Sequence, residues 1–127
     1  MSATHHPAAP GTAAPDRHAT RHWLYQRASS VALPPLGLWF LFALLALPDL
    51  GHASVSGWMA KPLQATLMLL FTWCALWHSA LGLQVVVEDY VPARRQAVTL
   101  RMLRLVHWAA AIAASLAVWQ LALGGAA

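Results

Sequence analysis

The sequence predicts an all-α integral membrane protein in which three helices cross the bilayer. Hydrophobic residues make up 59% of the 127 residues and charged residues only 9%, whereas soluble domains carry roughly a quarter charged residues. So few charges cannot cover a water-facing surface. Three largely apolar runs each reach the roughly 20 residues that are needed to cross about 30 Å of hydrocarbon.

Two regions differ in composition. Residues 1–20 are rich in alanine, proline, threonine, glycine and histidine and have no periodic apolar face, which predicts a disordered tail. Residues 21–127 are expected to form one membrane anchor domain. The lone cysteine, Cys74, cannot form an internal disulfide and is interpreted as a small packing residue.

The first span is expected at residues 28–47, which carry no charge. Pro34 and Pro35 lie in its first turns, where a proline pair either delays the start of the regular helix or kinks it. Residues 49–62 are expected to form a short polar loop, and Lys61 is the only basic residue there.

The second span is expected at residues 63–87 and contains His78. Its end is well marked, because Pro92 disfavours helical backbone at Val91. The third span is expected at residues 99–123 and is rich in alanine. Small residues let neighbouring helix backbones approach closely, so we expect this helix to pack against protein.

The distribution of basic residues predicts the orientation. Arginines precede the first span and lie between, or just inside, the second and third spans, and they are Arg17, Arg21, Arg27, Arg94, Arg95, Arg101 and Arg104. Because basic residues stay in the cytoplasm, the N-terminus and the loop at residues 88–98 are expected there. Three spans then place the C-terminus in the periplasm. The net charge of +4 is thus explained by orientation, and no nucleic-acid partner is expected.

His78 is the main candidate for chemistry, because an ionisable residue deep in a membrane helix usually faces protein or a cavity. Gly82, four positions later, lies on the same helical face and leaves room beside the imidazole for a flat ligand. Asp89 follows His78 by eleven positions, which is about three turns and roughly 16 Å along the axis. Tyr90 is next to it. A buried histidine can ligate haem iron, and a tyrosine hydroxyl can donate to a carbonyl oxygen.

Simpler interpretations stand beside these. His78 fits a helix–helix hydrogen bond, and Asp89 and Tyr90 fit a helix cap and an interface anchor. His107, beside Trp108 in the third span, is a second candidate for haem ligation.

The stretch HSALGLQVVVEDY, from His78 to Tyr90, resembles the hydrophobic membrane anchor subunit (D subunit) of bacterial succinate dehydrogenase. That family shows a histidine, a glycine four positions later, and an Asp-Tyr pair at the end of the second of three helices. The segment QRASSVAL, from Gln26 to Leu33, is similar to the start of the family's first helix. The resemblance covers roughly residues 21–123.

The resemblance implies a membrane anchor subunit of succinate:ubiquinone oxidoreductase in the bacterial inner membrane. It implies that His78 is one axial ligand of a haem b iron, with a histidine of the cytochrome b subunit (C subunit) as the other. It also implies that Tyr90 binds ubiquinone, that Asp89 tunes the same site, and that Arg27 lies near this surface. The family pattern does not use His107.

The implied partners are the C subunit, the iron–sulfur subunit and the flavoprotein subunit. Succinate oxidation would take place on another subunit, so this chain would not be catalytic alone. Two other function classes stay open: a small proton-coupled transporter or channel subunit with His78 and Asp89 as relay residues, and an anchor without a cofactor. The direction of electron flow and the choice between ubiquinone and menaquinone are also open.

Overall fold

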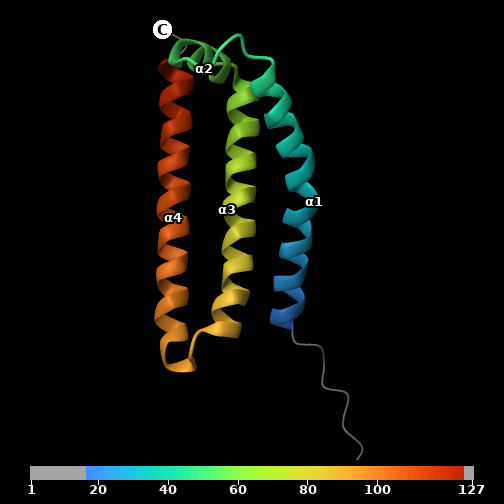
Figure 1. Cartoon of the computed structure of the whole chain (residues 1–127), viewed down its shortest axis with the longest axis vertical. Helices are drawn as coiled ribbons and strands as arrows, with labels where there is room; N and C mark the ends of the chain where they lie inside the picture. Colours follow the sequence, from blue (N-terminus) through green and yellow to red (C-terminus); the bar gives the residue numbers. More distant parts are fainter. Residues whose placement is uncertain (1–16, 125–127) are drawn as a thin grey trace, which may run out of the picture.

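A computed structural model describes residues 17–124, and within this range the chain forms four α-helices and no strand (Figure 1). The helices are α1 (Arg17–Leu45), α2 (His52–Met59), α3 (Pro62–Tyr90) and α4 (Ala93–Gly124). The helices α1, α3 and α4 are long and apolar enough to cross a membrane. The predicted all-α fold with three spans is therefore confirmed.

The three long helices are longer than the spans that hydropathy predicts, although α1 ends at Leu45, before the expected end at residue 47. They contain 29, 29 and 32 residues, which corresponds to roughly 44–48 Å of helix. A hydrocarbon core of about 30 Å is shorter, so the helix ends reach into the headgroup region. Polar side chains are tolerated in the headgroup region, so a helix can continue there past the end of its apolar run.

The start of α1 differs most from the expectation. The helix begins at Arg17, well before residue 28, because no proline or glycine interrupts the chain between Arg17 and Pro34. Residues 17–20, which were expected to belong to the disordered tail, are therefore helical. The remainder of that expected tail, residues 1–16, lies outside the described residues.

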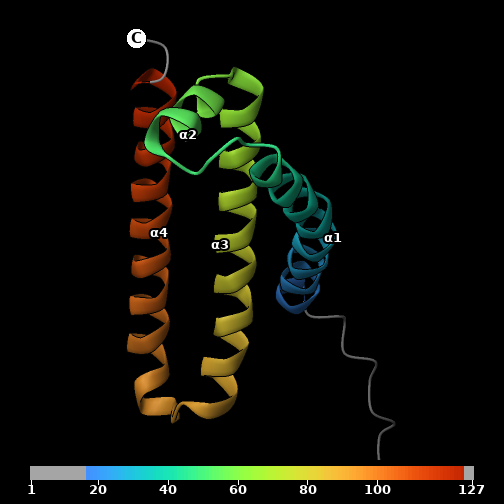
Figure 2. The same cartoon turned by 45° about the horizontal axis from the view of Figure 1, so that its top comes forward.

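Pro34 and Pro35 lie inside α1. The first of the two expectations for this pair, a late start of the regular helix, is therefore wrong. A proline ring removes a backbone donor and crowds the preceding turn, which bends a helix that continues through it. In Figures 1 and 2, α1 accordingly curves beside α3 and does not run parallel to it.

The connection after α1 was expected to be a loop, but it contains the short helix α2. Asp49 organises the turn before this helix, since its Oδ1 accepts a hydrogen bond from the Gly51 backbone N–H at 2.7 Å. Hydrogen bonds from Ser54 and Gly51 lower the pKa of Asp49. The helix α2 then lies across the ends of α3 and α4 (Figure 2) and buries Met59.

The helix α3 lies between α1 and α4 (Figure 1) and packs against both, whereas the backbones of α1 and α4 do not meet within the described residues. Aromatic side chains line the two contacts. Phe40 of α1 stacks on Phe71 of α3 with ring centroids 5.3 Å apart. Trp73 of α3 meets Trp108 of α4 edge to face at 5.8 Å, and the Trp73 indole N–H donates to Ser115 Oγ at 3.0 Å.

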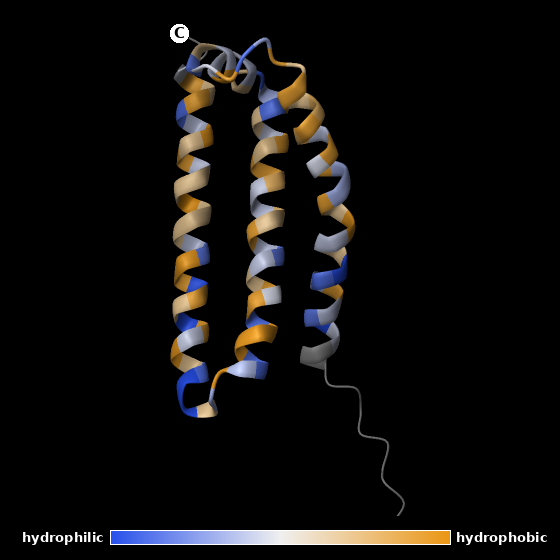
Figure 3. Cartoon of the chain, in the orientation of Figure 1, coloured by the Kyte–Doolittle hydropathy of each residue, from blue (hydrophilic) through white to orange (hydrophobic). Residues whose placement is uncertain are grey.

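Few side chains are buried in this bundle. The buried apolar residues of the described range are Met59, Leu81, Ala111 and Val118. Many large apolar side chains stay exposed, and Val31 at 73% and Leu45 at 72% are examples. Figure 3 shows apolar residues along all three long helices and hydrophilic residues gathered near the α3–α4 connection. Such a surface suits lipid or another membrane subunit, while the cytoplasmic assignment of that connection stays a prediction.

Candidate functional site

His78 lies half-buried in α3, on the side that faces α1. Its Nδ1 atom is 3.0 Å from Ser29 Oγ. Ser29 is only 6% exposed, and its Oγ also lies 2.9 Å from the Tyr25 carbonyl oxygen and 3.0 Å from that of Gln26. The Ser29 hydroxyl therefore links the backbone of α1 to the imidazole of α3.

The second ring nitrogen of His78, Nε2, has no hydrogen-bond partner within the part of the chain that the structure describes. Residues 17–124 also contain no cluster of three or more metal-ligating side chains. The imidazole is held through one nitrogen and can ligate through the other.

Gly82, one turn after His78, faces polar atoms of α1. A Cβ atom at Gly82 would meet Gln26 Nε2 at 3.9 Å, an ordinary contact distance. Two atoms of α1, His22 Nε2 and Gln26 Oε1, are buried without a hydrogen-bond partner in the described range. His22, Gln26 and Ser29 have the spacing of a single helical face. Because buried polar atoms are nearly always paired in native proteins, these two atoms indicate a polar partner that residues 17–124 do not provide.

Asp89 and Tyr90 form the last turn of α3. The helix is continuous from His78 to Tyr90, so Asp89 lies roughly 16 Å further along the axis in nearly the same direction, as the helical wheel predicts. Both side chains are exposed, and Tyr90 is 83% exposed. Within residues 17–124 neither contacts His78, and the neighbouring Glu88, not Asp89, accepts a hydrogen bond from Gln84 Nε2 at 2.8 Å.

Arg27 does not join this pair within the described chain. Its guanidinium lies over the Trp23 ring, 5.3 Å from the centroid, and no hydrogen bond or ion pair links it to Asp89 or Tyr90 in residues 17–124. The start of α1 and the end of α3 do lie at the same end of the bundle (Figure 1). The predicted proximity of Arg27 to this surface therefore stays a prediction.

The competing histidine, His107, lies on the other side of α3. Its Nδ1 atom is 2.9 Å from the Leu103 carbonyl oxygen, and its Nε2 is 3.4 Å from Ser79 Oγ. A carbonyl only accepts, so Nδ1 must be the donor. His78 faces α1, whereas His107 lies between α4 and α3, and the structure thus separates the two candidates for haem ligation.

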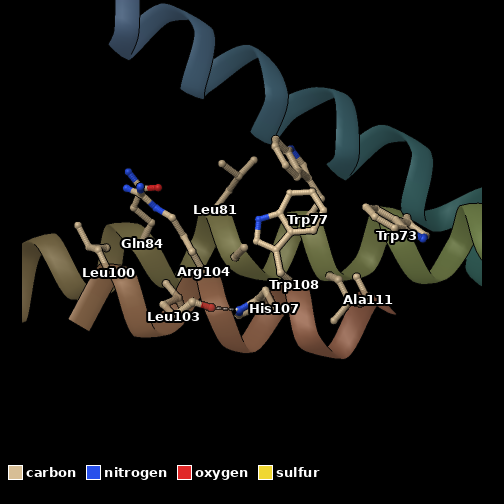
Figure 4. A pocket seen from close by; sticks show the side chains of 12 residues that line it. Trp73, Trp77, Leu81, Gln84, Leu100, Leu103, Arg104, His107, Trp108 and Ala111 are labelled. Carbon is tan, nitrogen blue, oxygen red and sulfur yellow. Dashed lines mark hydrogen bonds between the residues drawn. The ribbon is translucent and has the colours of Figure 1, made fainter. Parts of the chain in front are cut away.

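A cavity of about 250 Å³ lies between α3 and α4 and includes His107 (Figure 4). Its walls are mainly aromatic and aliphatic, and Gln84, Arg104 and His107 are its polar residues. This cavity was not predicted from the sequence. The spacing of Arg104 and His107, which share a face of α4, was the signal available for it.

Comparisons with known proteins agree with this geometry. Residues 10–118 match the family described as "Succinate dehydrogenase/Fumarate reductase transmembrane subunit". The succinate dehydrogenase hydrophobic membrane anchor subunit of Rickettsia bellii is 30% identical over 79 residues, which are 62% of this chain and 63% of that protein. The protein of the same name from Rickettsia prowazekii is 28% identical over 75 residues, 59% of this chain and 60% of that protein.

The chain thus spans about three-fifths of the length of the curated relatives that it matches. A multi-pass location in the bacterial inner membrane is consistent with these relatives and with the three apolar helices. The family match extends over most of the chain and includes α1, α3 and nearly all of α4. This chain therefore belongs to the family of succinate dehydrogenase and fumarate reductase transmembrane subunits, and its resemblance to the membrane anchor subunit is confirmed.

Proposed function

We propose that this chain is the membrane anchor subunit of a succinate:ubiquinone oxidoreductase and that His78 is an axial ligand of its haem b. The observation that carries the proposal is the state of the His78 ring. Nδ1 is bound by Ser29 at 3.0 Å, Nε2 has no partner within the described residues, and Gly82, one turn away, has no side chain of its own. Metal-ligating histidines typically use one nitrogen for the metal and donate with the other to a protein acceptor.

The unpaired atoms of α1 support a ligand in this region. His22 Nε2 and Gln26 Oε1 are buried without partners in residues 17–124, and both belong to the face of α1 that carries Ser29. A bound haem would supply one-electron transfer. The chain's own contribution is to orient the His78 imidazole and to exclude bulk water with the aromatic and aliphatic residues of α1 and α3.

The proposed quinone contact is at the end of α3. The Tyr90 hydroxyl donates a hydrogen bond to a ubiquinone carbonyl, and the Asp89 carboxylate sets the charge beside it. The exposure of both side chains supports this assignment, because the pocket would be completed by the quinone and by other subunits. No polar contact within the described chain has to be broken first.

The proposed partners are the cytochrome b subunit, the iron–sulfur subunit and the flavoprotein subunit. Two observations support partners in general: the exposed apolar side chains of the long helices, and the words "membrane anchor subunit" in the names of the relatives. In this assignment succinate oxidation takes place on a partner, and the chain passes electrons to quinone without being catalytic alone. The alternative of a proton relay from His78 to Asp89 lacks support, since no hydrogen bond or ion pair connects these two residues within residues 17–124.

The proposal is tested by replacing each histidine in the complete complex. In His78→Leu the axial nitrogen is lost, so the low-spin spectrum of reduced haem b should disappear or shift. His107→Leu is the matched control, because it removes an imidazole from the other side of α3 and should leave the spectrum unchanged. An unchanged spectrum in His78→Leu, with a lost spectrum in His107→Leu, would assign the ligand to His107 instead.

A further inference from the structure

We propose that Ser29 is a positioning residue that fixes the tautomer and the ring orientation of His78, so that Nε2 is the nitrogen presented to the haem iron. This inference rests on the proposed function and extends it to the residue behind the ligand. The sequence predicted that a helix–helix hydrogen bond is possible for His78, but it did not identify Ser29 of α1 as the partner.

The Ser29 hydroxyl lies close to two carbonyl oxygens and to one imidazole nitrogen. This hydroxyl carries one proton, and the carbonyl oxygens of Tyr25 and Gln26, at 2.9 and 3.0 Å, can only accept it. With that proton directed at the carbonyls, Oγ presents lone pairs to His78 Nδ1 at 3.0 Å. This contact is a hydrogen bond only when Nδ1 carries the ring proton. The neutral imidazole then has its free lone pair on Nε2, the form that binds iron.

Burial and a second contact with α3 hold the acceptor, Ser29 Oγ, in place. Ser29 is 6% exposed, so water does not compete strongly for its hydroxyl. The same residue is tied to α3 a second time, because Cys74 Sγ lies 3.7 Å from the Ser29 carbonyl oxygen. Cys74 is one turn before His78. Two contacts one turn apart on α3 therefore hold the Ser29 region against the ligand helix and limit rotation of the imidazole.

The Ser29 hydroxyl is expected to influence the midpoint potential of the haem through the His78 ring. An acceptor behind a metal-ligating histidine raises the basicity of the ligating nitrogen, and loss of such a partner typically changes metal affinity by roughly 10- to 100-fold. A more basic ligand favours ferric iron over ferrous iron. Removal of the Ser29 hydroxyl should therefore raise the midpoint potential, and a tenfold loss of the preference for ferric iron corresponds to about 59 mV for one electron.

The neighbouring serine provides a matched control. Ser30 Oγ also donates to the Gln26 carbonyl oxygen, at 2.7 Å, but Ser30 is exposed and has no contact with His78 in the described chain. Ser30→Ala therefore removes the same kind of local hydrogen bond from α1 without touching the ligand. Ser29→Thr and Ser29→Val form a second pair, which differs only in a hydroxyl against a methyl group.

The experiment measures the midpoint potential and the ferric low-spin electron paramagnetic resonance signal of haem b in the intact complex. Ser29→Ala and Ser29→Val should raise the potential and alter the signal, whereas Ser29→Thr and Ser30→Ala should resemble the parent. Should Ser29→Ala fail to assemble, the comparison of Thr with Val decides the question, because both side chains are larger than serine and alike in shape.

The failure of this inference is distinct from the failure of the proposed function. If His78→Leu removes the haem signal but Val and Thr at position 29 behave alike, His78 is the ligand and the role of Ser29 is wrong. If Ser30→Ala shifts the potential as much as Ser29→Ala does, a general disturbance of α1 is responsible and the inference is again wrong. If His78→Leu retains the parental signal, the ligand assignment itself fails, and any effect of Ser29 does not act through His78.

Discussion

At the scale of single residues, Tyr90 offers a direct test of the quinone contact, because its exposed hydroxyl can be removed without changing the ring. A lost hydrogen bond to a neutral acceptor is worth roughly 0.5–1.5 kcal/mol, and each 1.4 kcal/mol is about a factor of ten. Tyr90→Phe should therefore lower ubiquinone reduction by about two- to tenfold. The measurement is succinate-dependent reduction of a soluble ubiquinone analogue by the membrane complex.

Two controls separate a quinone contact from a defect in assembly. Succinate oxidation with a dye that takes electrons before the quinone should stay at the parental rate in Tyr90→Phe. The hydroxyl of the chain's other tyrosine, Tyr25, accepts a 3.5 Å hydrogen bond from Arg21, and Tyr25→Phe should leave quinone reduction intact. Equal loss of both activities in Tyr90→Phe would indicate assembly, and no loss would leave Tyr90 as an interface anchor.

The candidate residues on α3 could be predicted from the sequence, whereas Ser29 on α1 could not. His78, Gly82 and Asp89 lie on one helix, and α3 is continuous through all of them, so helical periodicity alone places them on one face. Ser29 precedes His78 by 49 residues, and no periodicity within α3 reports the crossing of a different helix. The partner of the imidazole therefore depends on how α1 packs against α3, and this packing could not be predicted from the sequence of α3.

At the scale of elements, hydropathy predicted that three spans exist but not where the helices end. Apolar residues report the hydrocarbon layer, whereas a helix ends where its backbone finds other partners. Hence α1 begins at Arg17 and not at residue 28. The helix α2 was missed because its 8 residues are too few to show a reliable period.

The contact between α3 and α4 can be measured through one hydrogen bond. Trp73 donates to Ser115 Oγ at 3.0 Å, and a double-mutant cycle with Trp73→Phe and Ser115→Ala isolates this pair. Such bonds within membranes average about 0.6 kcal/mol, so we expect a coupling free energy of this size in reversible unfolding in detergent. A coupling of zero would show that this hydrogen bond does not stabilise the contact between α3 and α4. Thr72→Ala with Ser115→Ala is the control cycle, because within residues 17–124 the Thr72 hydroxyl donates only to its own helix, to the Met68 carbonyl oxygen at 2.8 Å.

At the scale of the whole molecule, the bundle leaves most of its apolar surface uncovered. Within the described chain only Met59, Leu81, Ala111 and Val118 are buried apolar residues, so the three helices have little internal packing of their own. Because of this large number of apolar residues, hydropathy could predict that the chain is an integral membrane protein. It could not predict that α3 lies between the other two, because this arrangement depends on which helix faces fit together.

Dependence on a partner follows from this uncovered surface. Deletion of the cytochrome b subunit should reduce the steady-state amount of this chain in the membrane severalfold, because partly packed membrane helices are removed by proteolysis. Quantitative immunoblotting of membranes, normalised to an unrelated membrane protein, measures the effect. Full accumulation without that subunit would contradict the proposed pairing and favour a self-sufficient anchor.

The bond between Ser29 and His78 also has a consequence for how the protein is made. Chains leave the ribosome from the N-terminus, so α1 enters the bilayer before α3. A histidine in mid-membrane is costly when it has no polar neighbour. When His78 arrives, the Ser29 hydroxyl is already in the membrane and available to it. The order of the helices in the chain thus places the Ser29 acceptor in the membrane before His78. In a circular permutant with α1 after α4, His78 would enter the lipid before Ser29 is present.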